Sequence, residues 1–231
     1  MMAMDPISLA IVLALLALVP LAAVLTTSFV KIAVVMMLLR NALGVQQIPP
    51  NMALYALALI LSAYVMGPVI VQVGEELKTV GQTEQVFPGP DSESAAPAGN
   101  GNIASIISAV QRGVEPVRGF MMRHSDAQHR EFFVSSAREL WGDEQAAHLR
   151  QDDLLVLVPA FLLSELTAAF KLGFLLYLPF VIIDLIVSNI LLAMGMMMVS
   201  PITISMPLKL FLFVMVDGWT RLIQGLVLSY A

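Results

Sequence analysis

Six charged side chains interrupt the apolar sequence of the C-terminal third, between residues 154 and 231. Placing one such charge inside a bilayer costs at least ~2.5–3.5 kcal/mol on insertion scales, and more where the charge is unpaired. These charges therefore require partners of opposite sign, or surroundings of protein rather than lipid. The six are Glu165, Lys171, Asp184, Lys209, Asp217 and Arg221.

Spacing separates these charges into a local pair and a group that needs distant partners. Asp217 and Arg221 stand at i and i+4, which predicts an ion pair on one helical face. Glu165 and Lys209 have no opposite charge three or four residues away, so each needs a partner distant in sequence or in another subunit. The sequence leaves the choice among these partners open. The alternatives in the same third are Lys171 and Asp184.

Four methionines stand within five positions, around Gly195 and shortly before Pro201. Because Gly195 interrupts the cluster and Pro201 should end its helix, we expect a bend from which side chains project. A thioether side chain is unbranched and can repack against surfaces of changing shape. A movable apolar contact and ordinary membrane filler both remain open interpretations. The four are Met194, Met196, Met197 and Met198.

The sequence carries none of the common motifs of catalytic or nucleotide-binding sites. It contains no Walker A, zinc-protease, nucleophile-elbow or dinucleotide pattern, and it has no cysteine. His124 and His129 are interpreted as solvated side chains, since nothing near them completes a metal site. A net charge of −5 does not suit a nucleic-acid partner. We therefore expect a protein that is not an enzyme and has no cofactor and no metal.

Composition indicates a membrane protein. Of the 231 residues, 58% are hydrophobic and only 13% are charged. Three charge-free stretches each supply the ~20 apolar residues that a helix needs to cross ~30 Å of hydrocarbon. These stretches are Pro6–Val30, Asn41–Gly74 and Leu185–Leu208.

Composition also divides the chain into three segments, which we predict as domains. Residues 1–74 are predicted to form a hydrophobic helical hairpin whose turn is Arg40–Asn51, where glycine and two prolines break the helices. Residues 75–153 hold 13 of the 17 acidic residues and all three histidines, and predict a small, mainly helical polar domain. Residues 154–231 are predicted to form a second hydrophobic hairpin, with charged contacts and a methionine-rich loop.

The polar segment contains a loop signal followed by two helical patterns. Residues 87–102 are rich in Pro, Gly and Ser and predict a mobile loop. One apolar stripe then runs from Ile103 to Val117, and Pro116 is expected to kink or end that helix. A second stripe has helical spacing and charged residues on its other faces. It consists of Phe133, Ala137, Leu140 and Trp141.

The charges at the ends of the first hairpin predict its orientation. Lys31 and Arg40 lie near its turn, whereas Glu75 and Glu76 follow its second arm, so the turn should face the cytoplasm. Residues 75–153 then lie on the outer, periplasmic side. A cleaved signal peptide is the competing interpretation of the N-terminus, but no basic region precedes the apolar run.

Three long stretches resemble one protein family. They are "TTSFVKIAVVMMLLRNALGVQQIPPN", "PAFLLSELTAAFKLGFLLYLPFVIIDLIVSNILLAMGMMMVSP" and "MPLKLFLFVMVDGW", and they cover both hydrophobic thirds. They resemble the FliP/SctR family of export-apparatus proteins of the inner (cell) membrane in type III secretion systems. "NALGVQQIPPN" followed by "LILSAYVMGPV" is more similar to the injectisome branch (SctR, also called YscR) than to the flagellar branch.

The resemblance implies an all-α, membrane-associated fold and a function in protein export. It implies a homo-oligomeric five-copy ring that binds FliQ/SctS-like, FliR/SctT-like and FlhA/SctV-like subunits, the inner rod, exported unfolded polypeptides and membrane lipid. In that family kinked hairpins form a helical ring around a gated pore. The resemblance places Met194, Gly195 and Met196–Met198 at the constriction, and suggests that Glu165 and Lys209 meet between neighbouring subunits. A small-solute transporter or a membrane scaffold is the alternative that composition also allows.

Overall fold

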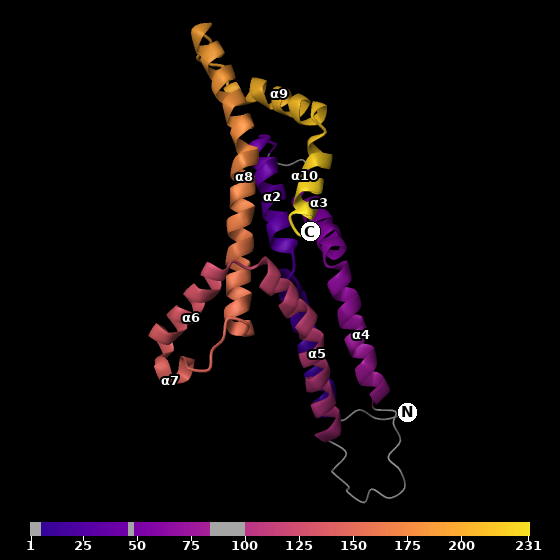
Figure 1. Ribbon diagram of the computed structural model, residues 1–231. Helices are drawn as coiled ribbons and strands as arrows, with labels where there is room; N and C mark the ends of the chain where they lie inside the picture. The colour runs from indigo at the N-terminus through magenta and orange to yellow at the C-terminus, as the bar shows by residue number, and fades with distance from the viewer. Residues whose placement is uncertain (1–5, 46–48, 84–99) are drawn as a thin grey trace, which may run out of the picture. The chain divides into compact units, whose positions relative to one another are not determined.

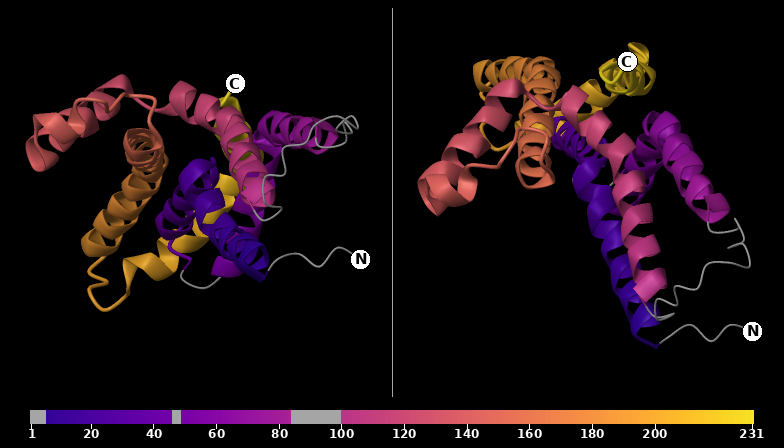
Figure 2. Two further views of the ribbon diagram at one scale, coloured as in Figure 1. Left: turned by 90° about the horizontal axis from the view of Figure 1, so that it is seen from below. Right: turned by 60° about the horizontal axis from the view of Figure 1, so that its bottom comes forward.

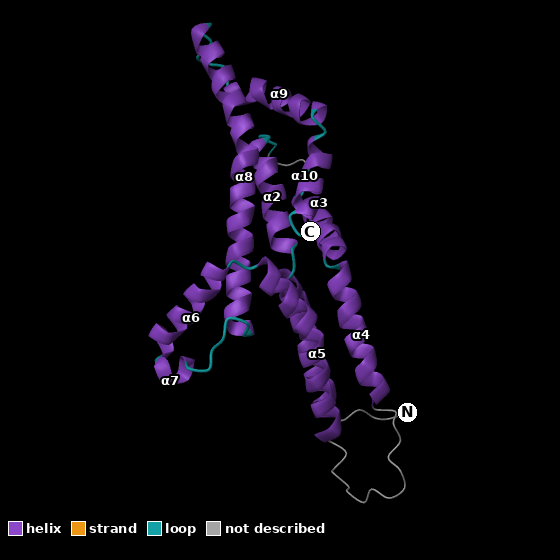
Figure 3. Ribbon diagram, in the orientation of Figure 1, coloured by secondary structure: helices purple, strands orange, loops and turns teal. Residues whose placement is uncertain are grey.

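The computed structural model describes residues 6–45, 49–83 and 100–231, and all regular secondary structure in these ranges is helical (Figure 3). The all-α prediction is therefore confirmed. The chain forms two compact units, which combine segments distant in sequence. One comprises residues 1–27 and 66–162, and the other residues 28–65 and 163–231. The predicted domains 1–74, 75–153 and 154–231 follow composition rather than these contacts, and they remain a prediction.

The first unit contains the polar segment. Its helices are α1 (Pro6–Thr26), α4 (Gly67–Thr83), α5 (Asn100–His124), α6 (Ala127–Trp141), α7 (Asp143–Ala146) and the start of α8 (Leu154–Ala193). Helix α5 packs along α4 and also contacts α1, as the views in Figure 2 show. At the far end of α5, the ring of Phe120 meets that of Phe161 edge-on at a centroid distance of 5.8 Å. Most of the predicted loop 87–102 lies outside the described residues, and Asn100–Asn102 open α5.

Two details of the polar segment concern its predicted apolar stripes. Of the two outcomes expected at Pro116, a kink or an end of the helix, the structure excludes the end, because α5 continues to His124. A proline removes only one backbone hydrogen bond, and burial of Phe120 and Met121 in the following turn offsets that loss. In α6 the predicted apolar stripe is only partly covered, because Ala137 is buried while Leu140 and Trp141 are exposed.

The second unit has α2 (Phe29–Ala42) at its centre, with α3 (Asn51–Val65), the rest of α8, α9 (Pro201–Met215) and α10 (Gly218–Leu228) (Figure 1). Ile32, Val35 and Met36 of α2 are completely buried in a core to which all five helices contribute. Helix α8 approaches α2 so closely at Gly173 that a Cβ there would overlap the side chain of Leu38.

Each arm of the predicted first hairpin consists of two helices rather than one. Between α1 and α2, the hydroxyls of Thr26 and Thr27 donate to the carbonyls of Ala22 and Ala23, four residues back. Such bonds compete with the helical ladder and favour a break. Helix α4 starts at Gly67-Pro68, where the missing proline N–H costs nothing because the first turn needs no donor there.

Length and composition make several helices suitable for a bilayer. Within the described ranges, α8 alone is long and apolar enough to cross one, and the number rises to as many as four if three interrupted helix pairs each count as one span. The pair α9–α10 is bent by 63°. Many large apolar side chains of these helices are exposed in the single chain. The chain thus has the composition of a membrane protein, and much of its apolar surface is exposed in the single chain.

Candidate functional site: a methionine turn and two buried charge clusters

The methionine cluster forms the turn between α8 and α9. Helix α8 ends at Ala193, and Gly195 follows with a φ of +74°. The N–H of Met196 donates to the carbonyl of Leu191 at 2.9 Å, and the N–H of Gly195 donates to that of Leu192 at 3.0 Å. These two bonds form a Schellman motif, which ends a helix with a left-handed residue. Glycine is favoured at this position because a Cβ strains the left-handed conformation.

This geometry confirms a turn but corrects the expected role of one proline. Pro201 does not end the helix that carries the methionines. It occupies the first turn of α9, where its ring is preorganised for a helix start. Gly195 ends α8 six residues earlier, because the Schellman bonds satisfy the last carbonyls there.

The methionine side chains point away from the chain's own core. Their exposed fractions are 67% for Met194, 39% for Met196, 82% for Met197 and 101% for Met198. Met197 and Met198, which are the most exposed, bury little or no apolar surface and so contribute little to the stability of the single chain. The turn therefore exposes a set of flexible thioether side chains that could contact another molecule.

A second feature is a buried cluster around Glu165 of α8. The Nζ of Lys31 in α2 lies 3.9 Å from Oε1 of Glu165, and only 6% and 3% of the two side chains are exposed. The hydroxyl of Tyr230 donates a hydrogen bond to the other oxygen of that carboxylate. The Nζ of Lys31 also lies 4.1 Å from the centroid of the Tyr230 ring. The three groups thus satisfy one another within the core.

Tyr230 remains a hydrogen-bond donor over the usual pH range. Burial away from water, and then the negative charge of Glu165, raises the pKa of the Tyr230 hydroxyl far above its ordinary value. The hydroxyl therefore keeps its proton. In the sequence, Lys31 indicated only membrane orientation, and no pattern pointed to Tyr230. The need of Glu165 for a distant cation was the one signal that could have led to Lys31.

A third feature is the environment of Lys209 in α9. Its Nζ lies 2.5 Å from Oδ2 of Asp184 in α8 and donates to the carbonyl of Ala42 at 3.2 Å. The hydroxyl of Ser205 donates to Oδ1 of Asp184 at 2.6 Å. Lys209 therefore pairs with Asp184, one of the two further charges that the sequence left open as partners. Lys171, the other alternative, is exposed on α8.

The single chain does not bring together the residues of two predicted charge pairs, Glu165 with Lys209 and Asp217 with Arg221. Glu165 and Lys209 each have their own partner within the chain, so the contact between subunits stays a prediction. Asp217 lies in the turn before α10 with a φ of +52°. Because it precedes the helix rather than belonging to it, its side chain does not follow the i, i+4 geometry. Within the residues that the structure describes, no ion pair joins Asp217 to Arg221.

A further question is whether the described residues include a group of side chains that could hold a metal ion. No cluster of three or more His, Cys, Asp or Glu side chains suited to a metal ion occurs in residues 6–45, 49–83 and 100–231. His124 instead packs its ring against Phe120, with a centroid distance of 4.6 Å. The three features of the described residues are thus an exposed methionine turn and two clusters of paired buried charges.

Comparison with known proteins places these features in a family. Residues 12–226 match the FliP family. The chain is 55% identical to "Yop proteins translocation protein R" of Yersinia pestis over 98% of this chain and 97% of the relative. It is 43% identical to "Virulence protein YscR" of Salmonella typhimurium over 98% of both. It is 42% identical to "Harpin secretion protein HrcR" of Erwinia amylovora over 98% and 97%.

These names are those of translocation, secretion and virulence proteins, and none is the name of an enzyme. They agree with the injectisome branch that the sequence resembled. The match covers both units of the structure and includes the methionine turn and all three residues Lys31, Glu165 and Lys209. The chain belongs to the FliP family.

Proposed function

We propose that this chain is a core channel subunit of a type III secretion export apparatus, and that it forms part of a gated pore for unfolded polypeptides. The observation that carries the proposal is the turn at residues 194–198. It exposes four methionines at the end of a helix of 40 residues, in a chain related to translocation and secretion proteins.

A pore for unfolded chains must meet two requirements. It must exclude water and ions at rest, and it must admit side chains of every size during transport. Apolar side chains can close a narrow pore by dewetting it. Branched Leu or Ile would also do this, but their stiffer side chains would adapt less to a changing cargo. In a ring, the exposed methionines of successive copies would form an adaptable gasket, and Gly195 would fix where each set projects.

The remaining apolar surface supports assembly with other subunits. Within the second unit, Glu165 and Lys209 both have partners of opposite charge in the chain itself. The exposed apolar residues of α8 and α9, such as Phe174 and Phe211, have no such cover. We propose that they face other copies in a five-copy ring, the FliQ/SctS-like and FliR/SctT-like subunits, the FlhA/SctV-like gate and membrane lipid.

The basic residues near the first turn and the acidic residues after the second arm support a periplasmic location for the polar segment. We propose an inner-membrane protein whose residues 75–153 face the periplasm, with Arg40 near the cytoplasmic turn. In the ring, Lys209 of one copy would approach Glu165 of the next, in addition to the partners that each has within its own chain.

Purification from cells that express the complete apparatus tests the proposed function. A tagged chain should be recovered as a ring of several copies together with the small hydrophobic partner subunits, as measured by native mass spectrometry. A fully active solute transporter recovered without these partners would contradict the proposal and favour the transporter alternative.

A further inference from the structure

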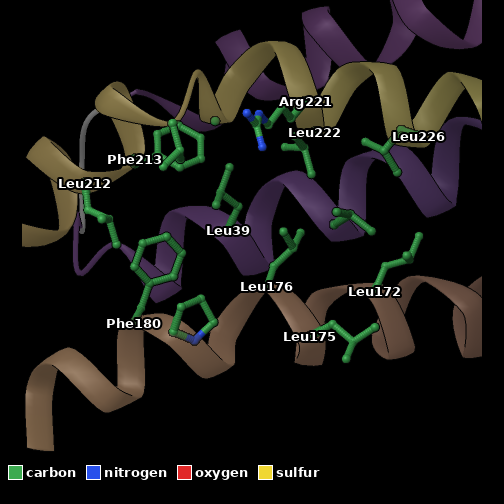
Figure 4. Close-up of a pocket in the computed structure, with 15 residues that line it drawn as sticks. Leu39, Leu172, Leu175, Leu176, Phe180, Leu212, Phe213, Arg221, Leu222 and Leu226 are labelled. Atoms are coloured by element: carbon green, nitrogen blue, oxygen red, sulfur yellow. The ribbon is translucent and has the colours of Figure 1, made fainter.

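An apolar pocket of about 460 Å³ opens in the second unit, between α2, α8 and the α9–α10 pair (Figure 4). Leucines and phenylalanines form its walls, among them Leu39, Leu176, Phe180 and Phe213. Arg221 of α10 is the one charged residue among those that line it. The pocket is therefore a hydrocarbon cavity with a single cation beside it.

Glycines on α10 show that the pocket is space that the chain itself leaves unused. A Cβ added at Gly218 would overlap the ring of Phe213, so internal packing accounts for that glycine. A Cβ added at Gly225, which also lines the pocket, would meet nothing within 4 Å. A glycine within a helix lowers helix stability relative to alanine. Gly225 thus lines the pocket at a position where a larger side chain would meet no other part of the described chain.

Arg221 gives the pocket its charge preference. Figure 4 shows Arg221 among the residues that line the pocket, and this residue is exposed overall. The acidic residue one turn earlier is Asp217, whose left-handed backbone places it outside the helix. Arginine binds phosphate oxygens in a two-pronged geometry. An anionic group at the pocket mouth would therefore meet a suitable donor.

We propose that this pocket binds the acyl chain of an anionic phospholipid, with its phosphate on Arg221. A helix with side chains is ~10–12 Å wide, so no more than roughly one turn of a neighbouring helix could enter the cavity. An acyl chain is narrower and can lie along the row of leucines. A chain with this many exposed apolar residues also meets phospholipid wherever it inserts.

Lipid titration of the purified full-length protein tests the site. Native mass spectrometry would compare phosphatidylglycerol with phosphatidylethanolamine carrying the same acyl chains. The wild type should bind phosphatidylglycerol more tightly. Arg221→Gln should weaken phosphatidylglycerol binding by about tenfold, the scale of one charge-assisted hydrogen bond. It should weaken phosphatidylethanolamine binding less, because the ammonium group of that lipid already offsets the charge of its phosphate. Arg112→Gln, which removes an exposed arginine from α5, is the matched control and should bind as the wild type does.

Two substitutions at Gly225 separate occupation of the pocket from folding. Gly225→Leu should fill the cavity and abolish both lipid adducts, whereas Gly225→Ala should strengthen α10 and keep them. Thermal unfolding and size-exclusion chromatography would show that both variants fold. Unchanged lipid binding in a folded Gly225→Leu variant would overturn the proposal. So would a density map of the assembled complex in which a protein segment fills the pocket.

Discussion

The ammonium group of Lys31 lies 3.9 Å from the carboxylate of Glu165, although the two residues stand 134 positions apart in the sequence. Both side chains are almost fully buried. Removing one member of a buried ion pair leaves the other charge uncompensated and costs ~3–5 kcal/mol. This contact joins α2 to α8, so loss of either partner alone should destabilise the packing of these two helices.

The first prediction concerns this pair. Lys31→Met and Glu165→Leu should each lower the recovery of folded protein, because each leaves one buried charge alone. The double variant should recover most of it, since apolar residues of similar size often replace a buried pair without loss. Thermal unfolding of the purified variants measures the effect. Equal stability of the wild type and both single variants would show that the pair contributes nothing.

Tyr230→Phe is the second prediction. It removes the hydroxyl that donates to Glu165 but keeps the ring under Lys31. A hydrogen bond to a charged group contributes ~1.5–3 kcal/mol, so the variant should unfold at lower temperature than the wild type. Tyr64→Phe is the matched control, because Tyr64 is 73% exposed on α3. The assignment fails if the two variants unfold at the same temperature.

The third prediction separates contacts within the chain from contacts between subunits. Asp184→Lys combined with Lys209→Asp should restore the bridge between α8 and α9 and recover more folded protein than either single change. If the predicted contact between subunits also exists, Glu165→Lys combined with Lys209→Glu should recover more assembled ring than either single change. Ring recovery by native gel decides. Because the second combination also places like charges against Lys31 and Asp184, a gain in assembled ring over the single changes requires the contact between subunits.

The orientation of the polar segment is the fourth prediction. The sequence has no cysteine, so a single introduced cysteine is a unique label. A membrane-impermeant maleimide should modify Ser135→Cys on exposed α6 in intact spheroplasts. It should modify Asn41→Cys, near the expected cytoplasmic turn, only after lysis. The reverse pattern of labelling would overturn the proposed orientation.

Local signals in the sequence predicted several features of the structure. Long apolar runs predicted helices, and the glycine within the methionine cluster predicted a bend, because both depend on neighbouring residues. Partners of buried charges depend on tertiary packing instead. The sequence showed that Glu165 needed a distant cation, but nothing local indicated Lys31 or Tyr230. The loss of the i, i+4 pair between Asp217 and Arg221 has a similar cause, because the turn before α10 is set by how α9 ends.

The turn itself gives the fifth prediction. Gly195→Ala should strain the left-handed residue that closes the Schellman motif, at a cost of ~1–2 kcal/mol. A Cβ at this position meets no other atom within 4 Å, so the effect comes from the backbone alone. Gly225→Ala, at a helical position with equal space, is the control and should not destabilise the protein. Equal thermal stability of the two variants would show that the left-handed turn is not needed.

Ion conductance of the assembled complex tests the central proposal most directly. In planar bilayers, the resting wild-type complex should conduct poorly, and a complex with Met196–Met198 replaced by alanine should assemble normally but leak ions. Alanine at Met52 and Met215, two exposed methionines outside the turn, is the matched control and should leave the complex tight. A tight, fully assembled complex with alanine at Met196–Met198 and normal secretion would contradict the gasket.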